Sequence, residues 1–129
     1  MDVVNVDYFS LGEKSCPCCG LNMVDENPGF LRALNSARSI YGSEMNATSM
    51  TRCPKHNRRV GGVDGSAHVD GRAADIACSD PAERLKMVMA FLAAGFRRIE
   101  ISPVHVHVDM KQGKNVRNVL LLKTERGIV

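Results

Sequence analysis

Apolar residues recur every three or four positions in two stretches of the chain, which is the spacing of an amphipathic helix. The first stretch covers residues 30–41, and Gly42 behind it is a natural end for a helix. The second begins at Asp80-Pro81-Ala82-Glu83, a capping box with proline at the first helical position, and closes at Gly95. The residues expected to form its buried stripe are Leu85, Val88, Met89 and Leu92.

Short apolar runs and apolar–polar alternation indicate the strands. Residues 73–78 form an apolar run typical of a buried strand, and residues 99–102 and 104–110 alternate. Residues 45–49 and 116–122 are two further candidate strands. Because helices and strands follow one another without a regular βαβ rhythm, the sequence predicts an α+β domain with a largely antiparallel sheet and flanking helices.

Composition narrows the class of protein. The 129 residues suit a single domain over residues 1–129, with the motifs of interest at about 9–110. The strongest apolar stretch, residues 87–96, is too short to cross a bilayer, so we expect no membrane span. The net charge of +3 comes from scattered basic residues, which disfavours a nucleic-acid partner.

Residues 52–72 are rich in Gly, Asn, Asp and Arg and are expected to form a long structured loop, a feature that is commonly functional in a compact domain. This loop contains His68, seven residues before Asp75, and no regular strand presents both side chains on one face. A loop that turns at Gly71 into a strand can aim both at one place. The plainer interpretation is a loop histidine and a turn aspartate.

The sequence His-Val-His-Val-Asp at residues 105–109 alternates like a strand, so His105, His107 and Asp109 share a face, with neighbours about 6.6 Å apart. A solvated polar face of an edge strand explains this pattern without a metal. Combined with His68 and Asp75, however, the segment completes two histidines and one carboxylate, a ligand set of catalytic zinc. Spacing alone does not choose between His105 and His107 as the third ligand.

Ser66-x-His68-x-x-Gly71-x-Ala73-x-Asp75, followed some thirty residues later by His105-x-His107, resembles the zinc D-alanyl-D-alanine carboxypeptidases and related murein peptidases. These enzymes share a structural group with lysostaphin-type enzymes and the hedgehog signalling domain. The similarity extends to residues 49–57, 61–62 and 95–97, and covers most of the chain between residues 9 and 109.

The resemblance assigns a role to each matching residue. The implied zinc ligands are His68, Asp75 and His107. His105 is implied to assist catalysis, Arg52 to hold a substrate carbonyl or carboxylate, and Ser66 to support the first ligand or the substrate. Asp109, on the strand face of His107, is expected to hydrogen-bond a histidine of the site. The implied reaction is zinc-dependent hydrolysis of a D-alanine-containing bond in peptidoglycan peptides, as a carboxypeptidase or endopeptidase. We expect the chain to act as a monomer.

One departure from the group concerns the general base. Some members carry a glutamate three residues before the last ligand, where this chain has Val104, and the nearest acidic residue on that side is Glu100. The chain therefore looks like the His-x-His branch. Met50-Thr51 also departs from the Gly-aromatic pair that usually precedes the arginine.

Five cysteines is an odd number, which argues against a fully paired disulfide framework. A second, structural zinc at Cys16, Cys19 and Cys53 is one interpretation, and a disulfide between an N-terminal cysteine and Cys53 is another. Simple buried thiols are the interpretation that we favour. Cys78, in the apolar run of the 73–78 strand, is expected in the core.

Two alternative functions stay open at this point. One is a non-catalytic zinc-binding domain of the same fold, used for wall or protein binding, and the other is a cysteine-centred zinc module. No basic N-terminal segment followed by an apolar run is visible, so we expect synthesis in the cytoplasm without a signal peptide. A phage or prophage enzyme that reaches the cell wall by lysis-type or virion-associated release fits that expectation.

Overall fold

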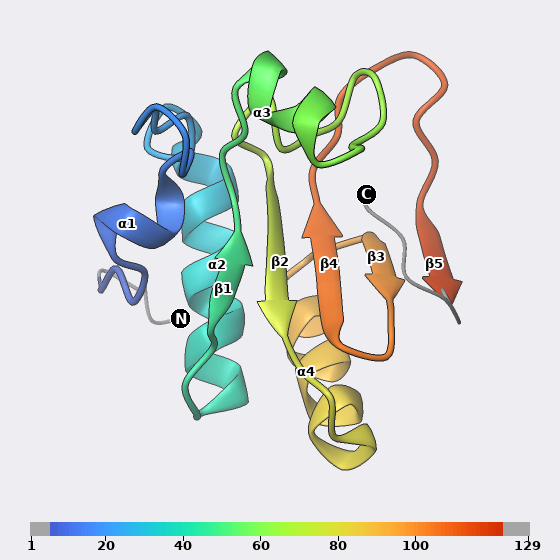
Figure 1. Ribbon diagram of the computed structural model, residues 1–129. Coiled ribbons are helices and arrows are strands. Elements are labelled where there is room, and N and C mark those ends of the chain that lie inside the picture. Colours follow the sequence, from blue (N-terminus) through green and yellow to red (C-terminus); the bar gives the residue numbers. More distant parts are fainter. Residues whose placement is uncertain (1–5, 123–129) are drawn as a thin grey trace.

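The computed structural model describes residues 6–122, which form a five-stranded sheet carrying its long helices on one face (Figure 1). The strand order is β1-β2-β4-β3-β5, in which only β3 and β5 pair in parallel. The predicted α+β class with a largely antiparallel sheet is therefore confirmed. The strands are β1 Ala47–Ser49, β2 Ala73–Ala77, β3 Arg98–Ile101, β4 His105–Asp109 and β5 Val119–Leu122.

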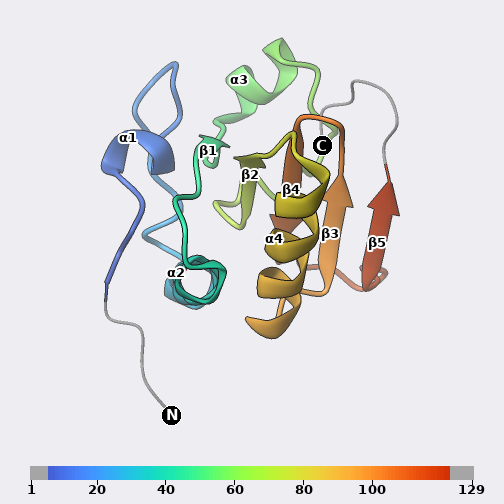
Figure 2. The ribbon, with the colours of Figure 1, turned by 90° about the horizontal axis from the view of Figure 1, so that it is seen from below.

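The two long helices and α3 lie on opposite sides of the sheet. Figure 2 shows the two long helices α2 and α4 on one face, where they pack against each other, and α3 on the other side. In the described part of the chain, none of the helices has both the length and the apolar character that spanning a bilayer requires. The helices are α1 Leu11–Lys14, α2 Pro28–Tyr41, α3 Pro54–Arg59 and α4 Pro81–Ala93.

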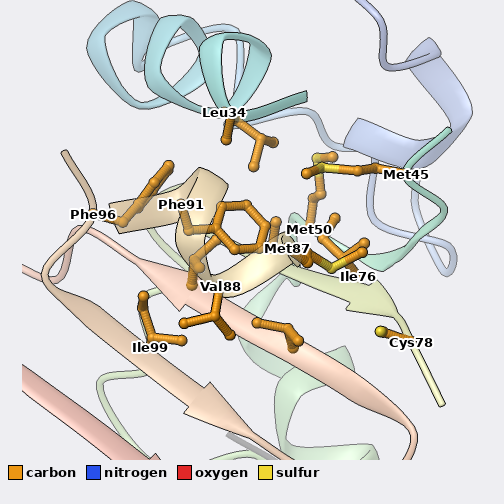
Figure 3. Packing of buried hydrophobic residues seen from close by; sticks show 14 of the residues in the cluster. Leu34, Met45, Met50, Ile76, Cys78, Met87, Val88, Phe91, Phe96 and Ile99 are labelled. Carbon is orange, nitrogen blue, oxygen red and sulfur yellow. The ribbon is translucent and has the colours of Figure 1, made fainter. Parts of the chain in front are cut away.

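The core fills the space between the sheet and the two long helices (Figure 3). Val106 and Val108 of β4 are fully buried, as the alternation of that strand predicts. Phe96 holds the helices together, because its ring packs edge-on against Phe91 of α4 at 5.6 Å and Phe30 of α2 at 6.0 Å. Such edge-to-face pairs stabilise beyond simple burial. The other face of β4 is left for polar side chains.

The buried stripe predicted for α4 is wrong at three of its four positions. Val88 is buried, but Leu85, Met89 and Leu92 are 63 %, 60 % and 44 % exposed. The helix packs instead through the face that contains Met87, Val88, Ala90 and Phe91. Its apolar residues surround much of the helix, so helical spacing alone does not select the packed side.

The predicted start of α4 is confirmed, with Asp80 as its N-cap, but the Glu83 side chain bonds Tyr41 rather than completing the capping box. The Asp80 carboxylate accepts a hydrogen bond of 2.9 Å from the Glu83 backbone N–H. The Glu83 side chain accepts a hydrogen bond of 2.7 Å from the Tyr41 hydroxyl, so it ties α4 to the end of α2. Gly42 ends α2 in the left-handed conformation, with φ of 79°, as predicted.

Two short helices were absent from the sequence prediction. α1 has only four residues, and it is held by a reciprocal capping box between Ser10 and Glu13. α3 lies inside the segment predicted as a loop at 52–72, with Cys53 as its N-cap. Neither helix is long enough to show a hydrophobic period.

Gly71 makes the predicted turn from this segment into β2, with φ of 72°. A side chain there would collide with the backbone of Met23, so the glycine allows the N-terminal segment to pack closely on the turn. The Asn27 amide group reinforces this contact, because it donates hydrogen bonds of 2.8 Å to the Met23 and Asp70 carbonyls.

We predict that Gly71→Ala destabilises the fold more than Gly65→Ala, by about 1–3 kcal/mol in the free energy of unfolding. Gly65 is the matched control, because its φ of 73° is almost the same while nothing lies within 4 Å of the position that a Cβ atom would take there. Both variants carry the cost of a left-handed alanine, roughly 1–2 kcal/mol. Urea unfolding measures the difference, and equal losses in the two variants would contradict the packing argument.

Candidate metal centre

The antiparallel register of β2 and β4 places Asp75 directly opposite His107. The Asp75 Oδ1 atom lies 2.8 Å from His107 Nδ1. The neighbours Ile76 and Val106 are also paired, but they point into the core. Because successive side chains alternate across a sheet, Asp75 and His107 share the face away from α2 and α4.

His68 reaches the same face from the loop before Gly71. The Ser66 hydroxyl accepts a hydrogen bond of 3.2 Å from the His68 backbone N–H, which supports the loop at this point. His68 Nδ1 lies 2.6 Å from the Met50 carbonyl oxygen. A carbonyl only accepts, so Nδ1 carries the hydrogen and Nε2 keeps a free lone pair.

The three side chains form a compact, buried set of donors. The ligand atoms of His68, Asp75 and His107 all lie within 4.8 Å of one another. His68 Nε2 is buried and, among the described residues, has no hydrogen-bond partner, although Asp75 Oδ2 is 3.4 Å away. A buried lone pair needs a donor or a cation. Two imidazole nitrogens and a carboxylate oxygen fit Zn²⁺.

Asp109 supports this set from behind His107. Its Oδ2 lies 2.7 Å from His107 Nε2, so Nε2 donates to Asp109 while Nδ1 faces Asp75. Its other oxygen accepts from Arg98 Nε at 2.7 Å and from the Lys111 backbone N–H at 2.9 Å. A carboxylate in this position orients the ring and fixes which nitrogen is available to a metal.

Arg52 supports the set from behind Asp75. Its Nη2 is 3.4 Å from Asp75 Oδ2, and the guanidinium also donates to Asn57 Oδ1 at 3.1 Å and Ser49 Oγ at 3.2 Å. Only 3 % of Arg52 is exposed. A side chain at Gly62 would collide with Asn57 and Arg52, so the glycine makes room for this arrangement.

The remaining predicted site residues lie beside the set. His105 is two positions before His107 on the same strand face, and its Nδ1 is 3.1 Å from the Ser102 hydroxyl. Ser66 lines a cleft of about 120 Å³ together with His107, Asp109 and Lys111. The cleft gives a ligand access to the edge of the buried set.

Burial and charge pairing set the protonation states. Burial alone would raise the pKa of Asp75, but its contacts with the His107 and His68 rings outweigh it and hold that pKa well below the usual range. Burial lowers the pKa of His68, so this ring is neutral. Burial would also lower the pKa of His107, but Asp109 and Asp75 outweigh it and raise that pKa to about 9. At neutral pH the His107 imidazolium thus lies between the Asp75 and Asp109 carboxylates, beside the neutral His68 ring.

A second cluster of possible ligands was only partly predicted. Cys16, Cys18, Cys19 and Cys53 bring their sulfurs within 4.8 Å of one another. The favoured interpretation of simple buried thiols is wrong here, because Cys18 and Cys19 are exposed. The C-x-x-C spacing grouped Cys16 and Cys19 with Cys53 and left out Cys18. Cys78 lies in the core, as predicted.

The donor set fits a zinc ion, and a comparison with known protein families indicates the class of protein. A family model described as Peptidase M15 matches residues 10–109, which is more than half of the chain. The chain therefore belongs to the M15 family of peptidases, for which zinc is typical and peptides are the substrates. A search of curated proteins found no match.

We predict that His107 in the reduced, metal-free protein titrates near pH 9 and that Asp109→Asn lowers this midpoint. The raised pKa stabilises the metal-free fold fully below about pH 6.5. This contribution is lost as the pH rises through about 9. NMR of the imidazole signals measures the midpoint, with Asp64→Asn as a control on the surface. A His107 midpoint near 6.5 would show that the ring is not clamped between the two carboxylates.

Proposed function

We propose that this chain hydrolyses a peptide bond in bacterial cell-wall murein, at a D-alanine-containing bond, with one zinc ion held by His68, Asp75 and His107. The convergence of these three donors at the edge of an open cleft carries the proposal. Membership of the M15 family supports peptide hydrolysis, and the resemblance of the motifs to the D-alanyl-D-alanine carboxypeptidases supports the choice of bond.

A lysine at the cleft supports a substrate that ends in a carboxylate. Arg98 and Lys111 line the cleft beside His107, together with two acidic residues, Glu100 and Asp109. Arg98 is already paired with Asp109 at 2.7 Å, whereas Lys111 contributes only its backbone N–H to that carboxylate. The Lys111 ammonium is therefore the group that we assign to a peptide C-terminus, which favours the carboxypeptidase form of the reaction.

The residues of the chain then have separate tasks in the reaction. Zinc, when bound, activates water and polarises the peptide carbonyl as a Lewis acid. Asp109 keeps the His107 ring in the orientation that offers Nδ1, and Arg52 keeps the Asp75 carboxylate in place. Since Arg52 is almost fully buried, we assign it to positioning Asp75, and its contact with a substrate carbonyl stays a prediction.

His105 is the residue that we propose for proton transfer. Its Nδ1 is held by the Ser102 hydroxyl at 3.1 Å, so Nε2 is the nitrogen available to a leaving amine. Because the chain lacks a glutamate three residues before His107, we assign the proton donor to His105 of the His-x-His motif. A monomer that acts on the wall after lysis-type or virion-associated release is part of the same proposal.

The first test incubates the purified protein with murein peptides that end in D-Ala-D-Ala, with and without a chelator. We expect cleavage only in the absence of chelator and its recovery on adding zinc, with the product masses naming the bond. Loss of terminal D-alanine identifies a carboxypeptidase, and internal cleavage an endopeptidase. A zinc-loaded protein that cuts none of these peptides would instead support the non-catalytic binding domain.

Variants separate metal binding from proton transfer. We predict that Asp75→Asn abolishes cleavage and weakens zinc binding, whereas Asp70→Asn, at an exposed position in the loop before β2, changes neither. His105→Ala should keep its zinc and lose about 10²–10⁴-fold in kcat. Zinc analysis and steady-state kinetics measure both effects. If His105→Ala retained full kcat, the proton would come from another group.

A further inference from the structure

The cysteine cluster, formed by Cys16, Cys18, Cys19 and Cys53, joins two segments that lie far apart in the sequence. Cys18 Sγ is 3.6 Å from Cys16 Sγ and 3.3 Å from Cys53 Sγ. Four sulfurs around one zinc, each about 2.3 Å from it in a tetrahedron, lie about 3.8 Å apart. The spacing in this protein, with all four sulfurs within 4.8 Å, matches that arrangement.

The backbone of the first segment is folded so that its three cysteines face one point. The Gly20 N–H donates to the Cys16 carbonyl at 2.8 Å, and the Cys16 N–H donates to the Leu21 carbonyl at 2.7 Å. Gly20 takes the left-handed conformation that closes this turn, with φ of 79°. These bonds are made by the backbone, so the turn exists before any ligand is added.

Backbone N–H groups point at two of the sulfurs. The Cys53 N–H donates to Cys16 Sγ at 3.4 Å, and the His56 N–H donates to Cys53 Sγ at 3.3 Å, where Cys53 caps α3. Hydrogen bonds of this kind favour the thiolate, which is the form of cysteine that binds metals. All five cysteines are free thiols in this structure, so the four sulfurs of the cluster are available as ligands.

We propose that the cysteine cluster binds a structural zinc ion, separate from the centre at His68, Asp75 and His107. Four thiolates complete a tetrahedron and leave no position for water, which is the pattern of structural rather than catalytic zinc. The ion fastens the N-terminal turn to the start of α3. This inference stands independently of the proposed hydrolysis of murein.

The cysteine cluster is linked to the candidate metal centre through the adjacent residues Arg52 and Cys53. Cys53 is the neighbour of Arg52, whose side chain contacts the Asp75 carboxylate. The Arg52 backbone N–H also donates to the His68 carbonyl at 3.1 Å. A zinc ion on Cys53 therefore restrains the loop that supports two of the three proposed ligands at the other site.

The test replaces zinc by Co²⁺ in the reduced full-length chain, because thiolate ligands give cobalt a near-ultraviolet absorption band that histidine and carboxylate do not. We expect the band in the wild type and in Asp75→Asn, which alters only the other site. It should disappear in the double variant Cys18→Ala/Cys19→Ala, together with one equivalent of bound zinc. Both residues are exposed, so their loss removes no core packing.

Two further variants guard against unfolding as the explanation. Cys78→Ala changes a cysteine outside the cluster and should keep the band, and Cys19→His should keep the ion with an altered band, because histidine is also a zinc ligand. Circular dichroism checks the fold of each variant. A wild type without the band, a band unchanged in the double variant, or a disulfide within the cluster in freshly isolated protein would each overturn the proposal.

Discussion

The register between β2 and β4 is the constraint on which the rest of the structure depends. It sets Asp75 against His107 on one face and Ile76 against Val106 on the other. A slip of one residue would send the carboxylate into the core and an isoleucine into the polar face, because side chains alternate along a strand. Burial of Ile76, Val106 and Val108 under the long helices therefore holds the proposed ligands in position, although none of these apolar side chains belongs to the centre.

Charges alternate along a row of side chains through the centre. Arg52 lies against Asp75, Asp75 against His107, His107 against Asp109, and Asp109 against Arg98, with separations between 2.7 and 3.4 Å. Buried charges are tolerated when each has partners of opposite sign. The row keeps Asp75 and His107 oriented, and it ends at each side in a guanidinium held by other polar groups. The cost of burying two carboxylates is thus offset within the row itself.

The sequence predicted those parts of the fold that rest on local chemistry. The strand at 105–109, the cap at Asp80 and the turn at Gly71 each follow from a few adjacent residues. The packed side of α4 does not follow from adjacent residues, because Leu85 and Met89 are as apolar as Val88 and only the position of the sheet decides which are buried. The candidate site shows the same difference between what local pattern predicts and what only long-range pairing decides. Spacing left His105 and His107 equivalent, whereas the pairing of β4 with β2 sets His107 beside Asp75 and His105 opposite Ala77.

The strand pairings of the sheet differ in how far apart the paired residues lie in the chain. β3 and β4 form a hairpin whose paired residues are close in the chain, so closing it costs little entropy. Asp75 and His107 are 32 residues apart, with the whole of α4 between them, and pairing them closes a much longer loop. A folding chain therefore meets the hairpin before it meets the ligand set. The candidate centre is complete only when β2 has paired with β4, so a chain caught before that pairing has no centre with which to capture its metal.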